Sequence, residues 1–276
     1  MTSEQMTSEK MTSEKMTSER FEVSHLVNLA ARLAREAGDL VSIGRRSGEL
    51  GARTKSSATD MVTRWDGASE SFIVERLRSA RPDDAVVGEE GARSEGSSGI
   101  SWLIDPIDGT TNFLYDLGGY AVSIAACDDD GPVAAAVYVP SVRELFTATR
   151  NGGAFLGSVP LSCSSTTDAT TALIATGFSY DAQRRTAQGS RIANLIGQVR
   201  DIRRLGAAAV DLCHVACGRV DGYFEESLQP WDMAAGLLIA TEAGATSSDF
   251  SGGPVRPEQT VVCAPGIHQA LVKHLG

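Results

Sequence analysis

The sequence predicts an α+β fold in which helices and sheets lie in layers, and three observations predict it. Apolar residues recur at helical spacing from Leu26 to Leu40. Apolar runs separated by short turns follow between 101 and 150, which predicts an antiparallel meander. After about residue 160, short apolar runs alternate with helical segments, so a second layered half is expected beyond a boundary near 155–165.

The first two helices enclose a polar segment. The first helix carries one apolar face and ends at two glycines; these residues are Leu26, Leu29, Leu33, Ala37, Leu40, Gly44 and Gly48. A second helix is expected over about 67–80, before Pro82. The intervening "TKSSATDMVTRWD" (54–66) is too long and too polar for a simple turn, and long loops are often functional.

The remaining elements follow in order. Strands are expected at 85–88, 101–105, 120–127, 132–139 and 143–150, with a hairpin turn at 128–131. The second half is expected to hold strand 172–176, helix 184–199, strand 201–204, helix 206–217, strand 220–225, helix 231–243, strands near 246–250 and 259–263, and a final short helix. We therefore expect halves at 21–158 and 159–276 that form a single compact unit.

The first twenty residues are a five-residue repeat, MTSEQ, MTSEK, MTSEK and MTSER. A period of five fits neither a helix nor a strand well, and the segment is too polar to bury a core. The sequence therefore predicts a disordered tail over 1–20.

Composition excludes several partners and settings. The 276 residues carry a formal net charge of −10, so neither a nucleic acid nor an anionic membrane is expected as a partner. The chain has no apolar run near the roughly 18 residues of a membrane span, and its N-terminus lacks a secretory signal. Its cysteines are odd in number, five, without a CxxC pair, which favours a reducing cytoplasmic setting. Cys213, His214 and Cys217 are interpreted as a buried helix face rather than a metal site.

Carboxylates gather at the ends of the expected strands. Glu89 and Glu90 follow the strand at 85–88, Asp105 and Asp108 follow the apolar run at 101–104, and Asp232 begins an apolar helix. Like charges this close repel unless a proton or a cation lies between them. Oxygen ligands with little histidine nearby favour Mg²⁺ over zinc. The alternative is that Asp108 and Asp232 only cap helices.

The segment "DGTTN" (108–112) adds a second feature. Gly109 allows the backbone to approach a ligand closely, and a helix starting there offers free N–H groups to an anion. Pro106 fixes the backbone between the aspartates, so the carbonyl of Ile107 is a further candidate ligand. The residues by themselves therefore indicate Mg²⁺ with a phosphate, and leave the reaction open.

Four motifs in order resemble those of the inositol monophosphatase family. They are "KSSATDMVTRWD" (55–66), "VVGEEG" (86–91), "WLIDPIDGTTNF" (102–113) and "PWDMAAGLLIATEAGA" (230–245). The resemblance covers residues 21–276. It implies a layered αβαβα sandwich, a homodimer, two to three Mg²⁺ per site, lithium sensitivity and hydrolysis of a phosphate monoester by metal-activated water.

The resemblance also implies a role for each matching residue. Glu89, Asp105 and the Ile107 carbonyl would hold a first metal, and Asp105, Asp108 and Asp232 a second. Glu89 would face a third, weakly held metal, with Asp66 nearby. The catalytic residues would be Thr110, which with Asp66 orients the water, Glu90 in support, and Lys55 in the mobile loop. The amides of Gly109 and Thr110 would bind phosphate oxygens.

The C-terminal half is expected to set specificity. The resemblance places Gly206, Ala207 and Ala208 against the substrate ring together with Asp108, and a hydroxyl often present at position 207 of relatives is missing here. Glu225 would bind a hydroxyl, and Ser179 is a further polyol contact. A polyol site rejects substrates that leave its polar groups unpaired.

Inositol-1-phosphate is therefore the expected substrate. Histidinol phosphate, fructose-1,6-bisphosphate and 3′-phosphoadenosine nucleotides are alternatives within the family. A regulatory binding protein that retains the metal site is an alternative of another class, and a tail-mediated interaction protein is a third.

Overall fold

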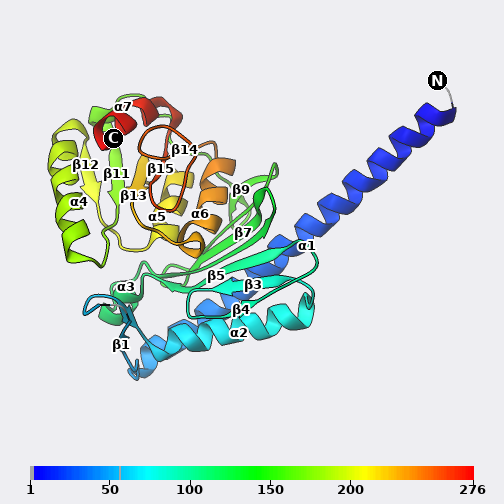
Figure 1. Ribbon diagram of the computed structural model, residues 1–276, viewed down its shortest axis with the longest axis horizontal. Helices are drawn as coiled ribbons and strands as arrows, with labels where there is room; N and C mark the ends of the chain where they lie inside the picture. The colour runs from blue at the N-terminus through cyan, green and yellow to red at the C-terminus, as the bar shows by residue number, and fades with distance from the viewer. Residues whose placement is uncertain (1–2, 56) are drawn as a thin grey trace.

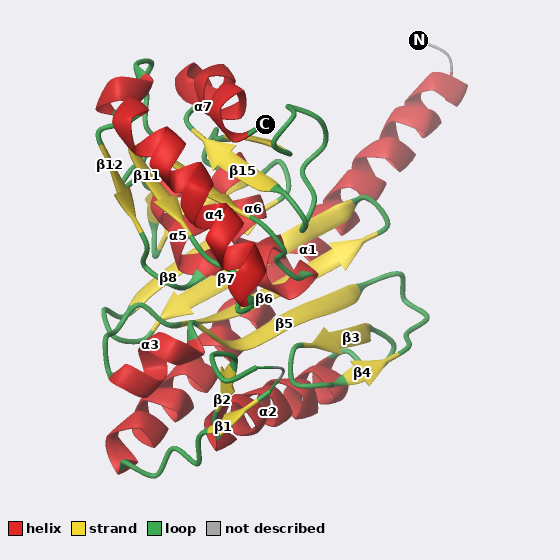
Figure 2. Cartoon of the chain, turned by 60° about the vertical axis from the view of Figure 1, so that its left-hand side comes forward, coloured by secondary structure: helices red, strands yellow, loops and turns green. Residues whose placement is uncertain are grey.

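The computed structural model describes the backbone of residues 3–55 and 57–276, and the side chains from residue 21 onward except that of residue 56. Its elements form five layers, as Figures 1 and 2 show: helices, an eight-stranded sheet, helices, a five-stranded sheet, and helices. The predicted α+β class and αβαβα layering are confirmed.

The outer helical layer contains α1 (Ser3–Ser47) and α2 (Arg64–Ala80). The backbone of residues 3–20 continues α1, and the disordered tail predicted over 1–20 stays a prediction. Met, Glu, Lys and Gln are good helix formers, and extending an existing helix needs no new nucleus. Figure 1 shows this end of α1 projecting beyond the sheets.

Helix α2 begins three residues earlier than predicted because of its cap. The Thr63 hydroxyl accepts the N–H of Trp65, and the Asp66 carboxylate accepts the N–H of Thr63 at 2.8 Å. This reciprocal capping box satisfies otherwise free N–H groups and sets the helix start at Arg64.

The large sheet runs in the order β10-β9-β8-β7-β6-β5-β3-β4. The predicted antiparallel meander is present as β5 to β8. The strands are β3 (Ala85–Gly88), β4 (Arg93–Ser94), β5 (Ser101–Asp108), β6 (Ala121–Asp128), β7 (Gly131–Val139), β8 (Glu144–Thr149), β9 (Gly153–Leu156) and β10 (Val159–Pro160).

Two details of this sheet position the acidic residues. Strand β3 is parallel to β5 with Gly88 opposite Ile104, so the turn after β3 lies beside the end of β5. Strand β5 is longer than predicted and reaches Asp108, with a register shift between Asp105 and Asp108. Such an irregularity bends the strand and re-aims its side chains.

The inner helices α5 (Ala208–Ala216) and α6 (Pro230–Glu242) pack between the two sheets. They approach closely because they are rich in small residues: a Cβ on Gly236 would lie 2.7 Å from Cβ of Leu212. Cys213 is fully buried in this core, in line with a structural role. One core therefore joins both halves of the chain, and the division at 158/159 stays a proposal.

The second sheet runs in the order β12-β11-β13-β15-β14, and α4 (Ala182–Leu195) and α7 (His268–Leu275) pack on its outer face. Its strands are β11 (Leu173–Thr176), β12 (Asp201–Arg203), β13 (Gly222–Glu225), β14 (Thr246–Ser248) and β15 (Thr260–Cys263). The short elements are β1 (Arg53–Thr54), β2 (Met61–Val62), α3 (Thr110–Tyr115), η1 (Ala169–Thr171), η2 (Ile196–Gln198) and η3 (Pro265–Ile267).

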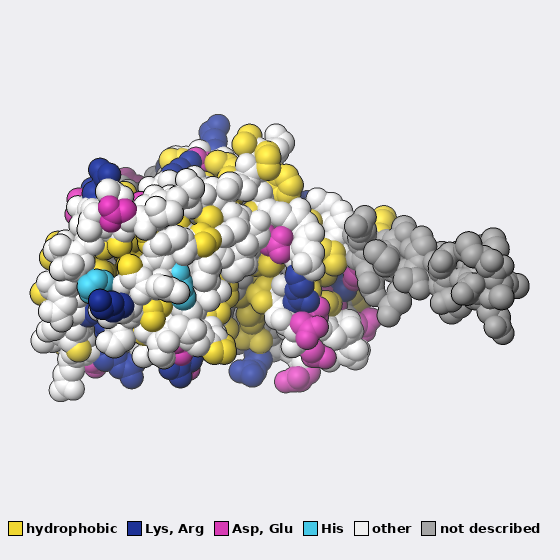
Figure 3. Space-filling model, turned by 90° about the horizontal axis from the view of Figure 1, so that it is seen from above, with side chains coloured by type: hydrophobic (Ala, Val, Ile, Leu, Met, Phe, Trp, Pro, Cys, Tyr) yellow, Lys and Arg dark blue, Asp and Glu magenta, His cyan; other side chains and the backbone are white. Residues whose placement is uncertain are grey.

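Among the described residues, every helix is too short or too polar to cross a bilayer. On the face seen in Figure 3, Lys and Arg side chains lie among Asp and Glu side chains rather than in one continuous patch. That face therefore has no broad region of electrostatic potential of one sign.

Candidate active site

A cleft of about 480 Å³ lies where the ends of β3 and β5 meet the starts of α5 and α6. It brings together thirteen of the fifteen site residues predicted from the sequence. These are Lys55, Glu89, Asp105, Ile107, Asp108, Gly109, Thr110, Ser179, Gly206, Ala207, Ala208, Glu225 and Asp232. The other two are hydrogen-bonded to members of this group: Asp66 accepts the Thr110 hydroxyl, and Glu90 accepts the Lys55 ammonium.

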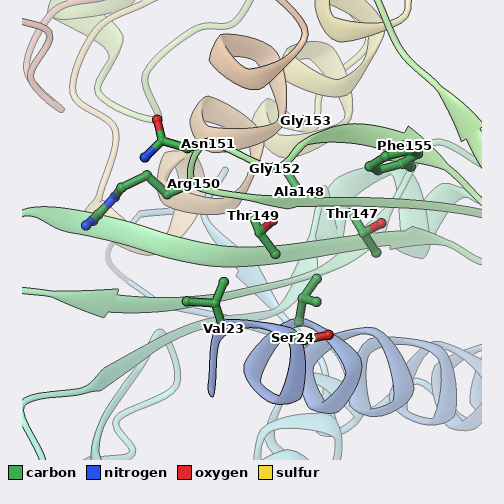
Figure 4. Close-up of a pocket in the computed structure, with 11 residues that line it drawn as sticks. Val23, Ser24, Thr147, Ala148, Thr149, Arg150, Asn151, Gly152, Gly153 and Phe155 are labelled. Atoms are coloured by element: carbon green, nitrogen blue, oxygen red, sulfur yellow. The ribbon is translucent and has the colours of Figure 1, made fainter. Parts of the chain in front are cut away.

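A second cavity, of about 640 Å³, lies between α1 and the β8–β9 turn (Figure 4). Its only charged lining side chain among the described residues is Arg150, which is already paired with Asp128 at 2.9 Å. The acidic cleft, though smaller, is therefore the one whose side chains suit metal-assisted chemistry.

The carboxylates of the cleft repel one another. Burial raises the pKa of Asp105 well above its ordinary value, and Glu89, Asp108 and Asp232 raise it further. Burial raises the pKa of Asp108 to about 7 and that of Asp232 to about 8. Perturbed carboxylates from separate motifs in one cleft are typical of a functional site.

Asp108 and Asp232 also cap helices, as the alternative interpretation expected. The carboxylate of Asp108 accepts the N–H groups of Ala208 and Ala209, at 3.1 and 2.7 Å, at the start of α5. Asp232 accepts the N–H of Gln229 at 2.7 Å. Each carboxylate is thereby held in one orientation, and capping leaves oxygen lone pairs available to a cation.

Thr110 lies between two partners. Its hydroxyl is 3.0 Å from the Asp66 carboxylate and 3.1 Å from the carbonyl oxygen of Ile107. Asp66 is fully buried; burial raises its pKa, and hydrogen bonds from Thr63 and Thr110 oppose that rise. The hydroxyl therefore has a fixed position beside the aspartates of β5.

Lys55 reaches the acidic group from the β1–β2 segment. Its ammonium donates to Glu89 at 2.9 Å and also to Glu90. Burial alone would lower the pKa of Lys55, but the two glutamates raise it above its ordinary value, so the ammonium stays charged. Burial raises the pKa of Glu90 to about 7. Within the described part of the chain, no three acidic, His or Cys side chains converge closely enough to form a ready-made metal site.

The far wall of the cleft comes from the C-terminal half. Glu225 accepts the Tyr223 hydroxyl at 2.6 Å, and a Cβ on Gly177 would lie 1.9 Å from its carboxylate, so a side chain there would displace the carboxylate. Gly109 has φ +85, and a Cβ there would lie only 3.0 Å from Cβ of Ala207. The Ser179 hydroxyl accepts the N–H of Asp181 at 3.1 Å.

A model of the inositol monophosphatase family matches residues 22–276. The chain belongs to that family. It is 41% identical to the inositol-1-monophosphatase of Mycobacterium leprae, over 90% of this chain and 92% of that protein. It is also 41% identical to the Nus factor SuhB of Escherichia coli, over 83% and 86%. The crystal structure of the suhB protein of Bartonella henselae superposes with a TM-score of 0.87 at 34% identity, covering 91% of this chain and 98% of that one.

This inositol monophosphatase family member has further cleft residues that sequence reasoning missed: Tyr180, Arg184, Arg204 and Trp231. Arg184 donates to the Ser227 hydroxyl at 2.9 Å, and Arg204 opposes the rise in the pKa of Glu225 that burial causes. Each lies close in sequence to a predicted residue, except Arg184, which enters from α4. Membership of the family supports a phosphatase.

Proposed function

We propose that the chain is a Mg²⁺-dependent phosphoric monoester hydrolase whose preferred substrate is inositol-1-phosphate. The observation that carries the proposal is the meeting of Glu89, Asp105, Asp108 and Asp232 on one cleft, with three of their pKa values raised by burial and mutual repulsion. A divalent cation relieves that repulsion, and hard oxygen donors suit Mg²⁺.

The donor set fits such a cation by its chemistry. Glu89, Asp105, Asp108, Asp232 and the Ile107 carbonyl would hold two to three Mg²⁺, with Asp105 shared. Bound Mg²⁺ polarises phosphate oxygens, lowers the pKa of water and steadies the leaving alkoxide. Because the described carboxylates do not form a ready-made site, binding would draw them together as they lose their protons.

The chain's own residues would then position the reactants. Asp66 holds the Thr110 hydroxyl at 3.0 Å, so that hydroxyl would orient the attacking water. The N–H groups of Gly109 and Thr110 would bind phosphate oxygens. Lys55 would balance the charge of Glu89 and Glu90 as its segment closes over the phosphate.

Phosphate release from four substrates tests the proposal. They are inositol-1-phosphate, histidinol phosphate, fructose-1,6-bisphosphate and 3′-phosphoadenosine 5′-phosphate, each with and without Mg²⁺. We expect the fastest turnover with inositol-1-phosphate, and none without Mg²⁺. A preference for histidinol phosphate would overturn the substrate assignment but not the reaction.

Replacing Glu225 should change substrate affinity rather than the chemical step. Glu225→Gln keeps the size of the side chain but weakens its bonds to substrate hydroxyls, so we expect KM for inositol-1-phosphate to rise about 10-fold with kcat little changed. Steady-state kinetics measure this. Hydrolysis of p-nitrophenyl phosphate is the control, because its leaving group carries no hydroxyl groups other than the one that is released. Its kcat and KM should be unaffected. A fall in kcat for both substrates would contradict a binding role.

A second candidate function is favoured by one comparison: the 41% identity to the Nus factor SuhB of Escherichia coli. In this case the chain would act as a Nus factor as well as, or in place of, hydrolysing a phosphate. Complementation of an E. coli strain lacking SuhB, by the wild-type chain and by Asp105→Asn, separates the two. Complementation by both would support a role that does not need catalysis, and complementation by neither would exclude this candidate.

We also propose a cytoplasmic, lithium-sensitive homodimer without nucleic-acid or membrane partners.

A further inference from the structure

Helix α2 carries a buried polar stripe. Asp66, Ser69 and Glu70 occupy positions i, i+3 and i+4, which share one face of a helix. Their exposed fractions are 0%, 0% and 5%, and the same face continues below them with Ile73 and Leu77. A buried polar side chain costs free energy unless it is hydrogen-bonded, so the partners of these three residues explain why they stand in an otherwise apolar interface.

Asp66 and Ser69 bond to the stretch that runs from β5 into α3, and Glu70 bonds to the turn after β3. The Asp66 carboxylate accepts the Thr110 hydroxyl at 3.0 Å. The Ser69 hydroxyl donates to the carbonyl oxygen of Pro106, between the two aspartates of β5, at 3.1 Å. The Glu70 carboxylate accepts the backbone N–H of Glu90 at 2.8 Å and that of Ala92 at 2.9 Å. One helix therefore holds two stretches of the chain, Pro106 to Thr110 and Glu90 to Ala92, in place relative to each other.

Glu70 fits its site closely. Its two oxygens each take one N–H of the turn that follows β3. A Cβ on Gly88 would lie 2.1 Å from one of these oxygens, so the carboxylate lies where any other residue at 88 would place its side chain. The same turn is bonded on its other side, where the N–H of Glu89 donates to the carbonyl of Ile104 at 3.1 Å. Glu89 is thus held between α2 and β5.

We propose that Glu70 is a positioning residue that sets the affinity of the cleft for a divalent cation by orienting Glu89 and Glu90. The proposal rests on the proposed function. Groups that hydrogen-bond the segments around metal ligands fix the ligand orientation, and their loss weakens metal binding. Glu70 does not itself reach the cleft, so it acts only through the backbone of the turn.

Glu70→Gln tests this. In the wild type, each oxygen of Glu70 accepts one backbone N–H. A glutamine side chain has only one acceptor oxygen, so its NH₂ group would face the other N–H, which would lose its acceptor. We expect Mg²⁺ alone, titrated into the metal-free protein by isothermal calorimetry, to bind about 10- to 100-fold more weakly. Circular dichroism of the metal-free variant should match the wild type. Glu75→Gln is the matched control, because Glu75 lies exposed on the same helix and should leave Mg²⁺ affinity unchanged.

A second variant guards against misfolding of the first. Glu70→Asp keeps both acceptor oxygens but shortens the reach by one methylene, so we expect a loss of Mg²⁺ affinity smaller than that of Glu70→Gln. Wild-type affinity in every Glu70 variant that folds would overturn the positioning role alone. If the wild-type chain itself binds no Mg²⁺, both this role and the proposed function are overturned.

Discussion

Asp105→Asn should abolish turnover. Asp105 is 2% exposed at the end of β5, and its carboxylate would be shared by two cations in the proposed function. Asparagine has nearly the same shape and can still accept the N–H of Ile107, now at 3.0 Å, so the main loss is the charge. We expect kcat/KM to fall about 1,000-fold or more, which is about 4 kcal/mol of transition-state stabilisation. Phosphate release from inositol-1-phosphate measures the fall.

The same substitution should stabilise the metal-free protein, although it abolishes turnover. Burial and the charges of Glu89, Asp108 and Asp232 all disfavour ionised Asp105, so the metal-free chain must take up a proton at this residue as it folds. Asparagine is neutral and needs no proton, so Tm without metal should rise. Asp129→Asn, in the exposed β6–β7 turn, is the control and should change neither quantity. Wild-type activity of Asp105→Asn in Mg²⁺ would refute the proposed metal site.

Removing Mg²⁺ should also abolish activity, and the stabilisation by Mg²⁺ should grow with pH. Without metal, the folded state holds protons on Asp108 and Asp232, with pKa about 7 and about 8, that the unfolded chain releases near the ordinary value of 3.8. Groups whose folded pKa is raised stabilise the fold below the unfolded pKa, and this stability is lost as pH rises through the folded pKa. The metal-free protein should therefore lose stability between about pH 4 and about pH 8 from these groups.

Mg²⁺ binds the ionised carboxylates, so at low pH its binding must displace the protons that they hold. At high pH fewer carboxylates hold a proton, and Mg²⁺ binds more tightly. We expect the difference in Tm between excess Mg²⁺ and EDTA to be larger at about pH 8.5 than at about pH 6. Differential scanning calorimetry of the same sample in both conditions measures it. An equal difference at both pH values would mean that the raised carboxylates are not the ligands.

Much of the fold was predictable from the sequence. Apolar runs bounded by turns predicted each strand of the meander to within one residue of its observed ends, apart from the longer β5, because β6 and β7 are buried along most of their length. The boundaries that differed have local causes: the capping box at Thr63 moves the start of α2, and the irregularity after Asp105 extends β5. The helical backbone of residues 3–20 has no counterpart in the sequence pattern, because a five-residue polar repeat has no apolar face.

The site divides in the same way. The sequence by itself determined which residue types were available: acids at strand ends, a glycine at 109, and four motifs in the order of one family. Only the tertiary structure decided how they meet, because contacts between segments far apart along the chain leave no local pattern. The parallel pairing of β3 with β5 brings Glu89 beside Asp105. The buried polar face of α2 joins Thr110, Pro106 and Glu90 to one helix, since each buried polar group needs a partner and only the packed fold supplies it.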